Sequence, residues 1–176
     1  MDQALDFLED SRQLFNLLLD NPDENFKIKT QFKNWTINDV IGHLHIFNFA
    51  ANLSLKSSDE FEIFFLPINE ALKKGASLLG IQKQWLNGLA GQALLDAWWR
   101  EACAVSKNFE IMDPKLRLKW FGPDMSARSS ITARQMETWA HGQEVFDILG
   151  KKRTENDRIK NIVHLGILTF SWTFKN

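Results

Sequence analysis

The chain has 176 residues, of which 44% are hydrophobic and 24% are charged, so it is long and apolar enough to bury the core of one globular domain. Its formal net charge is −1, with lysines and arginines scattered along the chain, which excludes the basic stripe that nucleic-acid binding requires. A single cysteine, Cys103, excludes an internal disulfide and a cysteine-based zinc cluster.

The apolar runs of the chain are too short to span a membrane. The longest, at residues 61–68 and 162–170, fall well below the roughly 20 residues that a span requires. The N-terminal segment MDQALDFLED carries acids where a signal peptide would carry Lys or Arg. We therefore expect a cytoplasmic protein of one domain, residues 1–176, with no membrane or nucleic-acid partner.

Helical periodicity runs through the chain and no strand-like alternation of any length interrupts it, so the predicted fold class is all-α. The first helix is expected at residues 2–19, with Leu5, Leu8, Phe15 and Leu18 near one apolar face. The Asn-Pro-Asp step that follows ends this helix, because proline cannot continue a helix interior.

The second helix has a clear start and carries two histidines. Thr36 and Asp39 have capping-box spacing, and Trp35 before them is placed as a hydrophobic staple. His43 and His45 point about 200° apart, so they cannot hold one ion together. The centre of the apolar face lies about 60° from His43 and about 140° from His45. His43 is therefore the inward histidine, and it is either a ligand or a core histidine satisfied by a hydrogen bond.

The middle of the chain is expected to be less regular. Residues 24–34 read as a connecting loop, and residues 60–74 as a third helix that Pro67 breaks or kinks. Four glycines between residues 75 and 91 predict a loose connection, the longest break in the chain.

Regular helices return in the second half. Residues 92–112 predict a long amphipathic helix that Pro114 terminates. The compact aromatic segment KWFGPDM, residues 119–125, follows, and it either covers a site on the next helix or packs in the core. The last helix is expected at residues 157–174, with His164 in a mostly apolar setting.

The stretch SARSSITARQMETWAHGQEVFDILG, residues 126–150, concentrates ligand-type side chains on one helix face. Serine hydroxyls can cap its start, and a terminal glycine stops it. Arg134, Glu137, His141 and Glu144 lie close to one line, since each residue advances about 100° around the helix. A divalent metal is one partner that satisfies a buried carboxylate and an imidazole together, whereas on a wet surface the two form an ordinary acid–base pair.

Facing helices of a bundle commonly build metal sites between them. His43 from the second helix, with Glu137 and His141, would supply two imidazoles and one carboxylate. Three protein ligands leave coordination positions open for water or substrate, as in catalytic sites, and the set suits zinc, our default, or iron or nickel. A fourth protein ligand would favour a structural role, and the chain offers three candidates: His164, Glu144 and Asp147.

Three segments carry a resemblance to a known family: WTINDVIGHLHIFNFAA, WFGPDMSARSSITARQMETWAHGQEVFDILG and VHLGILTFSW. Together they resemble the DinB-like superfamily, and within it the mycothiol-dependent maleylpyruvate isomerase N-terminal-domain group, closest to a branch of uncharacterised metal-binding proteins. The resemblance implies a four-helix bundle with an extended crossover connection. It also implies a divalent metal, usually zinc, held by the positions that fall here on His43, Glu137 and His141.

The chemistry that the resemblance implies uses a low-molecular-weight thiol, which the metal deprotonates and which attacks a small electrophilic substrate. The activity would be that of an isomerase or of a thiol S-transferase. Arg134 could then bind a carboxylate of the substrate or the thiol cofactor, and Glu144 could accept a hydrogen bond from His141 or a proton. Equally, Arg134 and Glu144 could pair with each other or with Glu137. The composition is rich in Lys, Asn, Phe and Ile and poor in Ala and Gly, unlike the proteins typical of mycothiol-producing bacteria, so it argues against mycothiol and leaves glutathione, bacillithiol or no thiol open.

Two other interpretations of the function remain open besides an enzyme. One is a non-catalytic metal-binding or dimerising helical module, in which a homodimer would form, and the other is a helical interaction domain without metal. Longer members of the resembling branch continue into a second, smaller C-terminal domain, so we expect that a C-terminal extension is missing from this chain.

Overall fold

The computed structural model describes residues 1–154 and 156–173, and the side chains of residues 1–154 and 156–170. Helices make up most of it, and the only strands in this described part are two of two residues each, which confirms the all-α prediction. None of the described helices combines the length and the hydropathy needed to cross a membrane.

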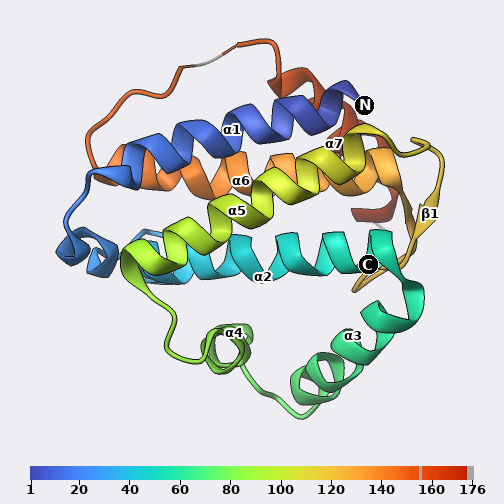
Figure 1. The fold of residues 1–176 in the computed structure, drawn as a ribbon, viewed down its shortest axis with the longest axis horizontal. Coiled ribbons are helices and arrows are strands. Elements are labelled where there is room, and N and C mark those ends of the chain that lie inside the picture. Colours follow the sequence, from blue (N-terminus) through green and yellow to red (C-terminus); the bar gives the residue numbers. More distant parts are fainter. Residues whose placement is uncertain (155, 174–176) are drawn as a thin grey trace.

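Four long helices form a bundle (Figure 1): α1 (Asp2–Leu19), α2 (Ile37–Lys56), α5 (Gly91–Glu110) and α6 (Ala127–Ile148). Helix α2 packs on α5 and on α6, and α1 packs on the other sides of the same two helices. Along the bundle α2 and α5 run in one direction, whereas α1 and α6 run in the other (Figure 1). Two consecutive bundle helices that run in parallel need a long connection, and this is the predicted extended crossover.

Helix α1 has the predicted bounds but a different apolar face. Leu5 is 49% exposed, whereas Phe7, Leu14 and Leu18 are fully buried. The buried row follows helical spacing through Ser11, whose hydroxyl donates to the backbone carbonyl of Phe7 at 2.8 Å. Because the polar residue Ser11 interrupts this buried row, the apolar pattern of the sequence does not indicate it.

Helix α2 begins as its sequence predicts. The Thr36 hydroxyl accepts from the Asp39 backbone N–H at 3.1 Å, and the Asp39 carboxylate accepts from the Thr36 N–H at 3.0 Å. Trp35, just before this capping box, is 6% exposed and packs in the core. The segment before it contains a 3₁₀ helix, η1 (Asp23–Lys27), and an isolated bridge between Lys29 and Thr36.

The crossover differs from the expectation in two ways. Helix α3 (Ser58–Lys73) continues through Pro67. The carbonyl that loses a donor there belongs to Ile63, which is 73% exposed, so water can hydrate it. The predicted loose connection at residues 75–91 is wrong, because it contains helix α4 (Leu78–Leu86).

The second connection is also ordered. Strands β1 (Arg117–Leu118) and β2 (Met125–Ser126) pair antiparallel, and the aromatic segment between them forms the tip of this hairpin. The Ser126 hydroxyl then caps α6 by accepting from the backbone N–H of Ser129 at 3.1 Å. Helix α7 (Ile159–Thr173) packs on α6, and the predicted helix end at Phe174 lies outside the described residues.

Candidate metal centre

The facing sides of α2 and α6 bring three ligand-type side chains together. Glu137 Oε2 lies 3.1 Å from His43 Nε2 and 3.4 Å from His141 Nε2. One donor atom from each of the three side chains lies within 4.8 Å of the other two. Adjacent turns of α6 supply Glu137 and His141, because residues four apart share a face. The spacing of the three donors matches a site for one ion.

Gln82 of α4 contacts the ring nitrogen of His43 that does not face Glu137. Its Oε1 lies 3.4 Å from His43 Nδ1 and can accept a hydrogen bond from a protonated Nδ1. The other ring nitrogen, Nε2, faces the Glu137 carboxylate at 3.1 Å, where it can share a proton with the carboxylate or bind a metal ion together with it. The donor set fits a divalent metal.

The environment of the three groups favours charge at Glu137. Burial on its own would raise the pKa of Glu137, but hydrogen bonds with His141 and His43 and the charge of Arg134 outweigh it. The pKa of this carboxyl is held well below its usual range, so it is ionised at neutral pH. Its side chain is 27% exposed, against 10% for His43 and 13% for His141, so the carboxylate is the part of the site that solvent reaches most easily.

Aromatic rings enclose the two imidazoles. The ring of Trp35 lies 5.5 Å from that of His43 and stacks at 6.5 Å on that of His141. Phe32 meets His141 edge-on at 5.0 Å, and Phe47 lies 4.7 Å from His43. These rings limit the access of water and hold both imidazoles in place, as the fixed geometry of a metal site requires.

Arg134 lies one turn before Glu137 and is 4% exposed. Its guanidinium carbon lies 5.0 Å from the ring centre of Trp120 and 5.4 Å from that of Phe47. Burial lowers the pKa of Arg134 to about 10, and the negative charge of Glu137 works against this shift. Arg134 is thus a buried cation beside the three groups.

Glu144 contacts the loop before α2 rather than either histidine. Its Oε2 accepts a hydrogen bond from the Phe32 backbone N–H at 3.2 Å. Because the ring of Phe32 lies against His141, this bond fixes one wall of the site. The predicted hydrogen bond from His141 to Glu144 is not among the contacts of the described side chains.

The other candidate side chains lie elsewhere. His45 packs on Trp85 at 5.2 Å, and burial, followed by the charge of Arg100, lowers its pKa to about 4. Asp147 is exposed and accepts from Gln143 at 2.9 Å. Within the described residues, neither joins the cluster of three donor groups.

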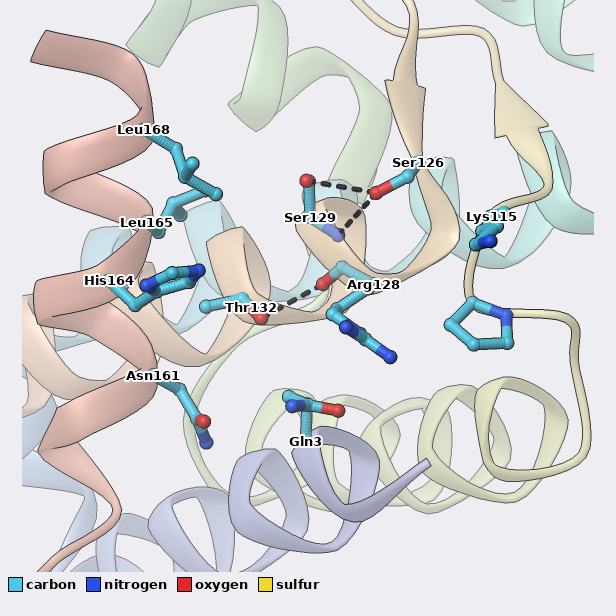
Figure 2. A pocket seen from close by; sticks show the side chains of 11 residues that line it. Gln3, Lys115, Ser126, Arg128, Ser129, Thr132, Asn161, His164, Leu165 and Leu168 are labelled. Atoms are coloured by element: carbon cyan, nitrogen blue, oxygen red, sulfur yellow. Dashed lines mark hydrogen bonds between the residues drawn. The ribbon is translucent and has the colours of Figure 1, made fainter.

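His164 extends from α7 toward the first turns of α6, where it lines a cavity of about 260 Å³ (Figure 2). Lys115 and Arg128 line the same cavity. None of the three metal-site residues does, so His164 is not positioned as a fourth ligand.

Gln82 is the site residue that sequence reasoning missed. It lies in the segment predicted as a loose connection, although Ser77 is a good N-cap residue and apolar side chains follow at helical spacing. Trp35 was predicted as a staple only, and the sequence carries no signal that its ring faces both histidines.

Comparisons with known proteins agree with this fold. A model of the family described as "Mycothiol maleylpyruvate isomerase N-terminal domain" matches residues 8–146, a range that includes His43, Glu137 and His141. Two uncharacterised proteins, from two strains of Mycobacterium tuberculosis, are each 31% identical to the chain over 169 residues. The aligned region covers 96% of this chain and 65% of each relative, so the chain spans about two thirds of their length.

Solved structures share the architecture. The crystal structure of the mycothiol-dependent maleylpyruvate isomerase superposes with a TM-score of 0.66, covering 93% of this chain and 66% of that one. A histidine-to-alanine mutant of that isomerase gives a TM-score of 0.64. Sequence identity is 12% in both cases, so these matches show a shared fold.

Proposed function

The chain belongs to the mycothiol maleylpyruvate isomerase N-terminal domain family, and from that premise we propose that it is a metal-dependent enzyme that uses a low-molecular-weight thiol on a small electrophilic molecule. The observation that carries this proposal is the group formed by His43, Glu137 and His141. Three protein donors suit a divalent ion and leave coordination positions for a ligand, which is the catalytic arrangement. Zinc is the expected ion, with iron and nickel as alternatives.

A divalent ion held by these residues would supply the positive charge that lowers the pKa of a thiol beside it. Side chains around the metal site would orient its ligands and limit the access of water. Gln82 keeps the Nε2 lone pair of His43 directed at the site, and Glu144 fixes the loop that carries Phe32. Trp35 and Phe47 limit water around the imidazoles, so that a thiolate there would meet the electrophile before solvent protonates it.

The reaction we propose begins with addition of the thiolate to one carbon of a conjugated double bond. Rotation about the resulting single bond and elimination of the thiolate complete an isomerisation, in which the thiol is regenerated. If the adduct takes up a proton instead, the carbon–sulfur bond stays and the reaction is a thiol transfer. A solved structure with the same fold is that of a mycothiol-dependent isomerase, which favours the first outcome for this chain.

Metal analysis of the purified, tag-free chain tests the proposal. We compare the wild type with His43→Ala and Glu137→Gln, and we use His45→Ala and Asp147→Asn as matched controls on the same two helices. About one ion per chain is expected in the wild type and the controls, and less than a tenth of that in the two site variants. A wild type that stays free of metal after incubation with Zn(II), Fe(II) and Ni(II) would overturn the proposal.

The role of the thiol needs its own measurement. With Co(II) in place of the native ion, binding of glutathione, bacillithiol or mycothiol should change the visible spectrum of the protein. If the protein binds metal but none of the three thiols changes its visible spectrum, the result favours the non-catalytic metal-binding module. A cytoplasmic location, a single domain over residues 1–176 and a homodimer remain predictions from the sequence.

A further inference from the structure

The cavity between α6 and α7 is lined by cationic side chains. It has a volume of about 260 Å³ and also reaches the start of α1 and the segment before β1 (Figure 2). Lys115 and Arg128 line it, and His164 of α7 adds a third positive charge when its ring is protonated. Among the described side chains that line the cavity, none is an aspartate or a glutamate. The cavity therefore attracts anions.

Backbone hydrogen bonds hold Lys115 beside Arg128. The Arg128 N–H donates to the Pro114 carbonyl at 3.1 Å, and the Ala127 N–H donates to the Leu116 carbonyl at 2.8 Å. Lys115 lies between these two carbonyls, so its position relative to the first turn of α6 is fixed. Two like charges at fixed positions repel each other, which costs stability unless a negative charge lies between them.

The acids next to the cavity do not supply that charge. Asp6 accepts a hydrogen bond from the Asn161 amide at 2.7 Å, and Asp113 accepts one from the Lys115 backbone N–H at 2.9 Å. In the described part of the chain, no carboxylate forms an ion pair with Lys115 or Arg128. The negative charge that this cavity lacks is left for a ligand to bring.

Side chains, rather than the free end of a helix, would hold this ligand. The N–H groups of Ala127 and Arg128 are already bonded, and the Ser129 N–H donates to the Ser126 hydroxyl at 3.1 Å. The Ser126 and Ser129 hydroxyls lie 3.0 Å apart, so one donates to the other and the second keeps its hydrogen for a ligand. An anion would thus meet a guanidinium, an ammonium group and one hydroxyl.

We propose that this cavity binds the phosphate group of a small phosphate monoester. Such a group carries a charge of about −1.5 to −2 at neutral pH, which matches two fixed cations better than the single charge of a carboxylate does. Its oxygens suit both the planar fork of Arg128 and the point charge of Lys115. Leu165 and Leu168 line the same cavity and offer apolar surface to the organic part of the ester.

This cavity is a different site from the metal centre, so the proposal does not rest on the proposed function. Arg128 and Thr132, which line the cavity, each lie nine residues before a metal-site residue of α6, Glu137 and His141. Nine residues turn a helix by about 900° and advance it by about 13.5 Å, so the two pairs face opposite sides of α6. The cavity and the metal centre therefore offer their ligands separate places.

Isothermal titration calorimetry of the full chain, in a buffer without phosphate, tests the proposal. The probes are phenyl phosphate, inorganic phosphate and benzoate. The site variants are Lys115→Gln and Arg128→Gln, which keep the backbone bonds at the start of α6. The matched controls are Lys107→Gln and Arg100→Gln, which remove the same charges at exposed positions of α5.

The wild type and both controls should bind phenyl phosphate more tightly than the other two probes. Each site variant should bind it about tenfold more weakly, the lower end of the range for hydrogen bonds to charged groups, because both side chains are exposed. A wild type that does not bind phenyl phosphate at millimolar concentration, or unchanged affinity in both site variants, would overturn the proposal. Equal affinity for benzoate or for inorganic phosphate would rule out the choice of a monoester.

NMR spectroscopy shows where the ligand binds. Phenyl phosphate should shift the amide signals of Lys115, Ser129 and His164 in ¹H–¹⁵N correlation spectra, and should do so equally in zinc-loaded and in chelator-treated protein. If the largest shifts fall instead on His43 and His141, the ligand binds at the metal centre and the second site is wrong.

The phosphate monoester can be a soluble molecule or the headgroup of a lipid. Cosedimentation with phosphatidylcholine vesicles, prepared with and without phosphatidic acid, separates the two sources. Sedimentation that requires phosphatidic acid and is weakened in Lys115→Gln and Arg128→Gln would assign the phosphate to a headgroup. Binding of phenyl phosphate without any sedimentation would assign it to a soluble ester.

Discussion

Replacing Gln82 with leucine tests whether this buried amide serves the metal site or only fills the core. Gln82 is 1% exposed, and its contact to the site is the 3.4 Å separation between Oε1 and His43 Nδ1. Partners that orient a metal-binding histidine typically change metal affinity 10- to 100-fold. Because 3.4 Å is long for an N–H···O bond, we expect the lower end, a loss of about tenfold or about 1.4 kcal/mol.

The stability of the metal-free protein should respond differently. Leucine removes Gln82 Nε2, a buried donor without a partner, which favours the folded state. The same change leaves His43 Nδ1 without its acceptor, which disfavours the folded state. These effects are of similar size, so we expect the free energy of unfolding to change by less than about 1 kcal/mol. Lower metal affinity at nearly unchanged stability is the signature of a positioning residue.

Competition with a chromophoric chelator gives the zinc affinity, and urea unfolding of the chelated protein gives the stability. The control is Gln84→Leu, which makes the same change at an exposed position of the same helix. Wild-type zinc affinity in Gln82→Leu, or an equal loss in Gln84→Leu, would refute the role of this amide.

Three further outcomes are expected. Chelation should lower the midpoint of thermal unfolding of the wild type but not of His43→Ala, because free metal at 100 times its dissociation constant stabilises the native state by about 2.7 kcal/mol. Asp10→Ala should cost about 3 kcal/mol in urea unfolding, against a negligible loss for the exposed Asp20→Ala at the end of the same helix. Asp10 is 2% exposed and accepts from Arg158 at 3.0 and 3.1 Å, so its removal leaves a largely buried cation unpaired. Thr36→Ala should cost about 1 kcal/mol in the same assay, and no change would mean that the capping box contributes nothing to α2.

Features that depend on neighbouring residues were predictable from the sequence. The capping box at Thr36 and Asp39 marked the start of α2 correctly, because both of its bonds lie within one turn. Helical geometry also selected His43 over His45, and the structure places His43 with Glu137 and His141 while His45 packs on Trp85. The helical faces alone and the family resemblance each indicate the same three side chains.

Features that depend on distant residues were not predictable. Helix α4 has nine residues, and an isolated helix of that length is marginal in water, so packing on α2 must stabilise it. The hairpin of β1 and β2 has two residues in each strand, too few for an alternating pattern. Nor did local sequence indicate that Glu144 would bond to the loop that carries Phe32 rather than to His141.

The two connections that the sequence left irregular are the ones that complete the candidate site. Because α2 and α5 run in parallel, the chain must return along the bundle between them (Figure 1). Helix α4 in that connection brings Gln82 to His43. The hairpin that joins α5 to α6 brings Trp120 to Arg134. The bundle helices thus supply the groups that would bind the metal, while the connections supply the groups that orient and cover them. Substitutions in the connections should therefore change the affinity for metal more than they change the stability of the bundle.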